Sequence, residues 1–212
     1  MTTPNQDMMV LQSWFSPAFP IGAFSYSHGL ETAIQQGHAA DSASLAAWID
    51  GLLRYGTGWN DALFIKLAYE DGPAINTLCL ALSSSKEREQ ETTELGRSFV
   101  RTLNASYGFE LPDGLAYPVA VGLAARQEGI SLALVIQSYL QAFAANLISV
   151  GVRAIPIGQQ AGQACLVQLY PVIERITKKV LDATEDGLGS AAFTSDLMAM
   201  MHENNSPRIY RT

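Results

Sequence analysis

Apolar residues recur every three to four positions along most of this chain, which is the spacing of an amphipathic helix. The first clear pattern follows residue 44, and its apolar face consists of Leu45, Trp48, Ile49, Leu52 and Leu53. Ser44 can accept a hydrogen bond from the first turn, so we expect it to cap this helix. Gly56 and Gly58 interrupt the pattern, and a second helix is expected to run from there to Gly72.

Further helical patterns fill the middle and the end of the chain. We expect a short apolar helix at 73–82, a helix after the loop at 107–118, and a long helix from 160 to about 183. Between the first two lies a charged helix whose inward stripe is Leu95, Phe99 and Leu103. We interpret its first part, Lys86 to Glu94, as a face exposed to water, because charge runs at helical spacing are usually solvated.

One segment, 130–152, contains no charged residue and is long enough to cross a bilayer. Its apolar residues nevertheless recur at helical spacing: Leu132, Val135, Ile136, Tyr139, Leu140, Phe143, Leu147 and Ile148. This wide stripe, interrupted by polar residues, favours a helix that is buried in the core or at a subunit interface, with Ser131 as its cap. A membrane-spanning helical protein remains the alternative.

The pattern as a whole predicts an all-α fold. Alternating strand patterns and internal repeats are absent from the sequence, and 48% hydrophobic against 16% charged residues suits a packed core. With 212 residues, we expect one domain over 1–212, a bundle of roughly eight to ten helices.

Charge and cysteine content limit the functional classes. A net charge of -7 argues against nucleic-acid binding, which needs clustered Lys and Arg. Cys79 and Cys165 lie far apart and form no metal-type pair, which fits a reducing compartment. The first ten residues have neither a basic segment nor a long apolar run, so we see no signal peptide and expect a cytoplasmic protein without membrane contacts.

The motifs of several enzyme classes are missing. The sequence contains no G-x-x-x-x-G-K-[ST], no G-x-S-x-G and no H-E-x-x-H. We therefore expect no GTP binding or hydrolysis by the chain itself. A catalytic triad assembles in space and leaves no obligatory sequence pattern, so a small helical hydrolase stays open as an alternative. Its mark would be a perturbed His–carboxylate pair in a deep pocket.

The opening stretch, residues 16–31, reads SPAFPIGAFSYSHGLE and is too apolar for a linker and too broken for a helix. Ser25 or Ser27 can cap a helix that passes through Glu31. His28 and Glu31 stand three residues apart, so one imidazole and one carboxylate could face a metal ion together. His202 is a further weak candidate, and with two ligands in one place we expect no firm metal site.

Four blocks of this chain together resemble the UreF family of urease accessory proteins. They are LQSWFSPAFPIGAFSYSHGLE at 11–31, YPVAVGLAA at 117–125, NLISVGVRAIPIGQ at 146–159 and SDLMAMMHENNSPRIYRT at 195–212. The resemblance spans nearly the whole chain in the right order. Two features depart from the family pattern: Ala116 replaces a frequent histidine, and the ending resembles R-L-F-R-S only in its arginines and aromatic residue.

The resemblance implies an all-helical, non-catalytic chaperone for nickel insertion into urease. It implies a homodimer that binds the accessory protein UreD (also called UreH), engages the GTPase UreG through that complex and docks on apo-urease. The chain would couple or modulate GTP hydrolysis by UreG and hold no cofactor tightly, with nickel only in transit. By the same resemblance, Ser25, Tyr26, His28 and Glu31 lie in or next to the functional surface.

The C-terminal segment, residues 203–212, contains Asn204, Asn205, Ser206 and Pro207, which break helices. We expect a mobile tail whose removal leaves the fold and the melting temperature almost unchanged. Arg208, Tyr210 and Arg211 are residue types that anchor interfaces. Together with the resemblance, they predict a tail that becomes ordered when a UreD-type partner binds and that helps to recruit the GTPase.

Overall fold

The computed structural model describes residues 4–212, which form an all-helical fold without a strand in that range. The α-helices are α1 (Pro4–Trp14), α2 (Leu30–Gln35), α3 (Ser42–Tyr55), α4 (Thr57–Asp71), α5 (Asn76–Ala81), α6 (Lys86–Tyr107), α7 (Tyr117–Glu128), α8 (Leu132–Ala154), α9 (Gln159–Asp182) and α10 (Phe193–His202). Short 3-10 helices lie at Ala23–Ser25, Pro73–Ile75 and Glu185–Gly187. The all-α prediction is thus confirmed.

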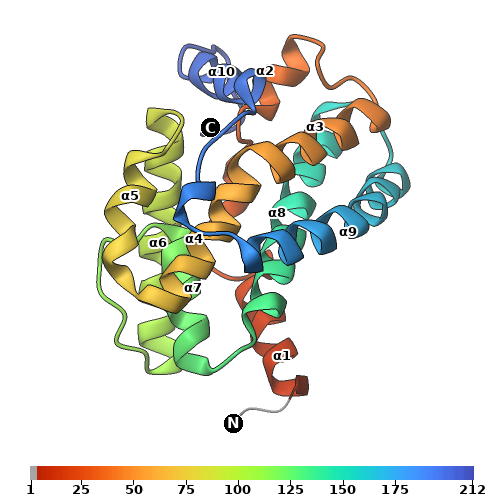
Figure 1. Cartoon of the computed structure of the whole chain (residues 1–212). Helices are drawn as coiled ribbons and strands as arrows, with labels where there is room; N and C mark the ends of the chain where they lie inside the picture. The colour runs from red at the N-terminus through yellow and green to blue at the C-terminus, as the bar shows by residue number, and fades with distance from the viewer. Residues whose placement is uncertain (1–3) are drawn as a thin grey trace.

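Helix α8 runs through the middle of the bundle, with α9 and α3 along one side and α4 and α7 on the other (Figure 1). Seven of its eight predicted stripe positions are buried, namely Val135, Ile136, Tyr139, Leu140, Phe143, Leu147 and Ile148. By length and composition α8 could cross a membrane, a test that core helices of soluble proteins also pass, and half of its most apolar window is buried. The apolar stripe of α8 therefore packs inside the core.

Helices α4 and α7 approach each other very closely. A Cβ placed on Gly122 of α7 would lie 2.4 Å from the carbonyl oxygen of Ile65 on α4. That distance is far inside van der Waals contact, so this crossing requires a residue without a side chain.

The prediction that Ser44 caps α3 is wrong, because the N-cap lies three residues earlier. Asp41 is the N-cap, and its side chain accepts a hydrogen bond from the backbone N–H of Ser44 at 2.8 Å. Ser44 instead completes a capping box by accepting from the backbone N–H of Asp41. Ser131 does occupy the N-cap position of α8, but its side chain makes no capping hydrogen bond.

At one end of the bundle, α2 and α10 lie side by side, and the C-terminus lies beside them (Figure 1). Their contact depends on Gly29, the N-cap of α2, which has a φ of 74°. A Cβ at Gly29 would lie 2.7 Å from the backbone nitrogen of Ala199 on α10. The positive φ and the close approach both favour glycine. This contact brings the opening stretch and the C-terminal segment together.

Candidate functional site

Three carboxylates line one face of α6 and organise the site. Glu87, Glu91 and Glu94 are spaced four and three residues apart, so they lie on one side of the helix. Glu87 and Glu91 are buried, with exposed fractions of 9% and 1%. The prediction that Lys86 to Glu94 faces water is therefore wrong for this side of the helix. We call these three residues the carboxylate face of α6.

Glu87, at the first position of the carboxylate face, meets His202, the last residue of α10. The Nδ1 atom of His202 lies 2.7 Å from Glu87, and its Nε2 atom lies 3.0 Å from Glu31 on α2. His202 is fully buried between these two carboxylates. Arg208 of the C-terminal segment also donates a hydrogen bond to Glu87. The cluster thus ties α2, α6, α10 and the C-terminal segment together.

Glu31 binds the main chain of the C-terminal segment directly. Its two carboxylate oxygens accept hydrogen bonds from the backbone N–H groups of Ile209 at 2.8 Å and Tyr210 at 3.0 Å. Burial disfavours the charged form of Glu31 and by itself raises the pKa. The hydrogen bonds from His202 and these two amides lower the pKa by more, so the pKa of Glu31 lies below the ordinary value. An ionised Glu31 therefore holds the segment by charge-assisted hydrogen bonds.

Glu91, at the middle of the carboxylate face, joins the opening stretch to the end of the chain. Its Oε1 atom lies 3.0 Å from Nε2 of His28, and its Oε2 atom accepts a hydrogen bond from the Thr212 hydroxyl at 3.1 Å. Burial disfavours the charge of Glu91, whereas His28 and Arg88 favour it, and its pKa is lowered overall. The main chain adds pairing here, because Ser27 donates to the Thr212 carbonyl oxygen and Arg211 to that of Ser25.

Glu94, at the last position of the carboxylate face, is the most exposed of the three carboxylates. It accepts hydrogen bonds from the Tyr26 hydroxyl and from Arg211, both at 2.7 Å. The Arg211 guanidinium also lies over the Tyr26 ring, 5.8 Å from its centre. Burial and the hydrogen bond to Glu94 raise the pKa of Tyr26 above its ordinary value, so the phenol remains a donor.

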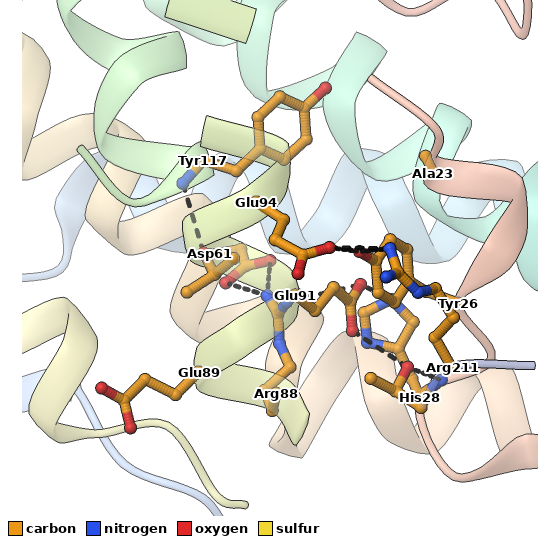
Figure 2. A network of polar contacts seen from close by, with 12 residues as sticks. Ala23, Tyr26, His28, Asp61, Arg88, Glu89, Glu91, Glu94, Tyr117 and Arg211 are labelled. Carbon is orange, nitrogen blue, oxygen red and sulfur yellow. Dashed lines mark hydrogen bonds and ion pairs between the residues drawn. The ribbon is translucent and has the colours of Figure 1, made fainter. Parts of the chain in front are cut away.

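A buried ion pair joins α6, which carries the carboxylate face, to the neighbouring helix α4. Arg88 donates to Asp61 on α4 at 2.9 Å (Figure 2). The Tyr139 hydroxyl of α8 donates to the same carboxylate at 2.6 Å. Because two acidic groups surround Arg88, they outweigh the cost of its burial and its pKa is raised. This network locks α6 to α4 and α8.

The structure corrects the prediction of a free C-terminal tail. Tyr210 is buried, with Arg153 of α8 over its ring at 5.1 Å, and Thr212 is buried as well. Burial is the main reason why the pKa of Tyr210 is raised. Within the same segment, Ile209 keeps 82% of its surface exposed. The segment therefore docks without a partner and presents an alternating buried and exposed surface.

The weak metal candidates do not converge on one point. His28 precedes α2, so it does not share a helix face with Glu31 as predicted: His28 faces Glu91, whereas Glu31 faces His202. Within residues 4–212 no group of three or more His, Cys, Asp or Glu side chains is arranged to hold a metal ion. The transient passage of nickel through this protein remains a prediction.

The predicted mark of a hydrolase is present only in part. The His28–Glu91 pair lines a cavity of about 310 Å³. Among the described residues no hydroxyl or thiol donates to the free Nδ1 atom of His28. A catalytic hydroxyl or thiol must lie within hydrogen-bond distance of the histidine that acts as its base. Among the described residues the pair therefore lacks the nucleophile of a triad.

All the residues that the sequence analysis named meet at this one site. Ser25, Tyr26, His28, Glu31, His202, Arg208, Tyr210 and Arg211 lie on or around the carboxylate face. The sequence analysis missed the carboxylate face itself and its supporting pair Arg88 and Asp61. The spacing of Glu87, Glu91 and Glu94 could have predicted this face, but the same spacing is equally typical of a helix face exposed to water.

Comparison with known proteins identifies the family of the chain. The family model for UreF matches residues 39–170. A urease accessory protein UreF of Cereibacter sphaeroides is 45% identical over 207 residues, which cover 97% of this chain and 98% of that protein. The UreF of Ruegeria pomeroyi is 42% identical over the full length of both chains, and that of Bradyrhizobium diazoefficiens is 39% identical over 95% of this chain and 90% of its own. This chain therefore belongs to the UreF family of urease accessory proteins.

Proposed function

We propose that this protein is a cytoplasmic, non-catalytic adaptor that serves urease maturation by helping to insert nickel into the metallocentre. Its partners are a UreD-type (UreH-type) protein, a UreG-type GTPase and apo-urease, and it couples GTP hydrolysis by the GTPase to nickel delivery. Nickel passes in transit and is not retained as a cofactor. The similarity to UreF proteins over nearly the full length supports this assignment.

One observation carries the proposal: the C-terminal segment and the opening stretch form a single composite surface on the carboxylate face. Next to it, α10 exposes an apolar face that consists of Phe193, Leu197, Met200 and Met201. Phe193 is 77% exposed, and Ile209 of the C-terminal segment is 82% exposed. Exposed apolar residues beside ordered arginines are typical of a protein-binding surface.

The test is co-purification and urease activation in cells that express the urease and its accessory proteins. We expect Arg211→Ala to weaken recovery of the partner complex, because one anchoring side chain typically contributes about 1–3 kcal/mol. The matched control is Arg101→Ala on α6, which is exposed away from these contacts and should leave assembly unchanged. Normal assembly and activation by Arg211→Ala would contradict the proposed surface.

We also propose that the protein is a homodimer within this complex. The apolar stripe of α8 is occupied by the core, so a dimer interface must use other residues. Val167 and Tyr170 on α9 are exposed apolar side chains that suit such an interface. Sedimentation velocity of the wild type and of Tyr170→Glu tests this, and a monomer at every concentration would overturn it.

A further inference from the structure

The cluster around His202 places both nitrogen atoms of one buried ring against carboxylates. Nδ1 of His202 lies 2.7 Å from Oε2 of Glu87, and Nε2 lies 3.0 Å from Oε2 of Glu31. Both distances are in the range of hydrogen bonds. The ring is fully buried, so bulk water does not replace either carboxylate as its partner.

Both carboxylates are acceptors in these contacts. Arg208 of the C-terminal segment donates a hydrogen bond to the other oxygen of Glu87, and two backbone N–H groups of the same segment donate to Glu31. Burial by itself raises the pKa of Glu31, but the hydrogen bonds from His202 and these amides lower it below the ordinary value. An ionised carboxylate only accepts hydrogen bonds, so each contact needs a proton between the ring nitrogen and the carboxylate oxygen.

This geometry sets a proton count. A neutral imidazole carries one N–H, so its second nitrogen would direct a lone pair at a carboxylate oxygen. The observed contacts therefore need a second proton, which the ring carries or shares with one of the two carboxylates. Groups in such close contact titrate together, so the second proton belongs to the cluster as a whole. We call His202, Glu31, Glu87 and Arg208 the proton latch.

The proton latch joins four parts of the protein, because α2, α6, α10 and the C-terminal segment contribute one residue each. Within residues 4–212 its ion pairs involve no other side chain. With the second proton, the two carboxylates are balanced by Arg208 and the ring. Without it, the cluster carries a net negative charge, and one of the two ring contacts becomes repulsive. A buried charge is costly unless it is paired, so loss of the proton opposes docking of the C-terminal segment.

The other titratable groups around the segment do not share this requirement. His28 faces one carboxylate, that of Glu91, so a ring with a single N–H satisfies the contact. Glu91 and Glu94 have lowered pKa values and stay ionised at neutral pH. Burial raises the pKa of Tyr26 and of Tyr210, so both phenols keep their protons at neutral pH. The contacts that change between neutral and weakly alkaline pH are therefore those of the proton latch.

We propose that the proton latch makes docking of the C-terminal segment pH-dependent, so that the segment is held at neutral pH and loosens as the pH rises. In the docked state the cluster keeps its second proton, whereas a histidine exposed to water loses its charge above about pH 6.5. The docked state therefore binds one proton more than the undocked state, and a rise in pH weakens it. One proton changes the docking equilibrium by at most about tenfold per pH unit.

The proton latch also gives the proposed partner surface a means of regulation. Ile209 and Arg211 lie on the same segment, with Ile209 82% exposed and Arg211 held by Glu94. A segment that loosens no longer holds these side chains in one arrangement, and the entropy of ordering them then opposes partner binding. This consequence rests on the proposed function, whereas the proton latch itself does not.

The first experiment follows amide hydrogen exchange of the full-length protein by NMR from about pH 6 to pH 9, around the range in which histidine titrates. The Ile209 and Tyr210 amides donate to Glu31 only in the docked state, so their protection reports docking. After correction for the intrinsic exchange rate, we expect this protection to fall toward higher pH by up to about tenfold per pH unit. Amides in the middle of α8 should show no such fall. Constant protection of Ile209 and Tyr210 over this range overturns the proposal.

Two variants assign the pH dependence to the proton latch. In Glu87→Gln the oxygen of the introduced amide can accept from Arg208 and its nitrogen can donate to Nδ1 of His202, so a neutral ring then makes both contacts. We expect a docked segment whose protection no longer depends on pH, and a dependence like that of the wild type would overturn the assignment. His202→Gln should also abolish the dependence, and Glu87→Gln keeps the test decisive if that variant fails to fold. The matched control is His38→Gln, which replaces an exposed histidine outside the proton latch and should keep the dependence of the wild type.

The second experiment co-purifies the accessory complex at about pH 6.5 and about pH 8.5, on either side of the expected change. Recovery with the wild type should be lower at the higher pH, whereas recovery with Glu87→Gln should be equal at both. If protection falls but wild-type recovery stays equal, partner binding does not need the docked segment, and the regulatory consequence is overturned. If deletion of the whole protein leaves urease activity unchanged, the proposed function fails, and the exchange measurement still decides whether docking depends on the proton latch.

Discussion

Removal of residues 208–212 should destabilise the protein itself, in contrast to the behaviour of a frayed end. The deletion takes away the two backbone N–H groups that donate to Glu31 at 2.8 and 3.0 Å, and the Thr212 hydroxyl that donates to Glu91 at 3.1 Å. It also takes away the buried ring of Tyr210. Glu31 and Glu91, which the fold holds in an ionised state, would lose these donors and keep only their contacts with His202, and with His28 and Arg88, respectively.

The magnitude follows from these contacts. A hydrogen bond to a charged group contributes about 1.5–3 kcal/mol, and burial of one large apolar side chain contributes about 1.5–3 kcal/mol. Water enters the vacated space and rehydrates the carboxylates, so the net loss is smaller than the sum. We expect a loss of about 2–4 kcal/mol in the free energy of unfolding. For a chain of this size that lowers the Tm by about 4–16 °C.

The assay is calorimetric melting of the purified chain, together with urea unfolding followed by circular dichroism. The matched control is Ile209→Ala, which removes an exposed side chain but keeps the amide that binds Glu31, and its Tm should stay within about 1 °C of the wild type. Hydrogen exchange should rise in α2 and α10 of the truncated chain. A truncated chain that melts within about 1 °C of the full-length protein would refute the reasoning.

Three further outcomes are expected. Glu31, Glu91 and Glu94 have lowered pKa values, so their contribution to stability is complete above the ordinary value of 4.5 and is lost as the pH falls below it, which unfolding titrations from pH 7 to pH 3 will detect. Asp61→Ala removes the carboxylate to which the buried Arg88 donates and leaves Arg88 with Glu91 at 3.4 Å, so it should cost about 3–5 kcal/mol in urea unfolding, far more than a surface substitution. The isolated chain should give no heat of GTP binding in calorimetry, because it contains no phosphate-binding loop.

The helices themselves follow from local information. The pattern around Leu45 and the uncharged stripe of 130–152 both predicted helices that the structure contains as α3 and α8. Apolar spacing is a property of neighbouring residues, so the sequence carries it directly. The N-cap of α3 was predicted at Ser44 but is Asp41, because both residue types can accept the backbone hydrogen bond of a first helical turn.

The candidate residues also followed from sequence, but their arrangement did not. Tyr26, His28 and Arg211 were named from residue type and from resemblance to the UreF family, and no spacing rule connects residues so far apart in the chain. Only the tertiary structure shows that they share Glu91 and Glu94 as acceptors. The same holds for the cavity, whose walls come from α1, the opening stretch, α6, α7 and α8.

The errors at Lys86 to Glu94 and at 203–212 have one physical cause. The charged run at Lys86 to Glu94 and the polar end at 203–212 were both read as solvated, since isolated charges and helix breakers prefer water. Each segment supplies what the other lacks: the first offers carboxylates, and the second offers two arginines and a hydroxyl. A buried charge is tolerated only with a partner, and that partner lies more than a hundred residues away. Local sequence determined which groups are available, whereas the fold decided which of them meet.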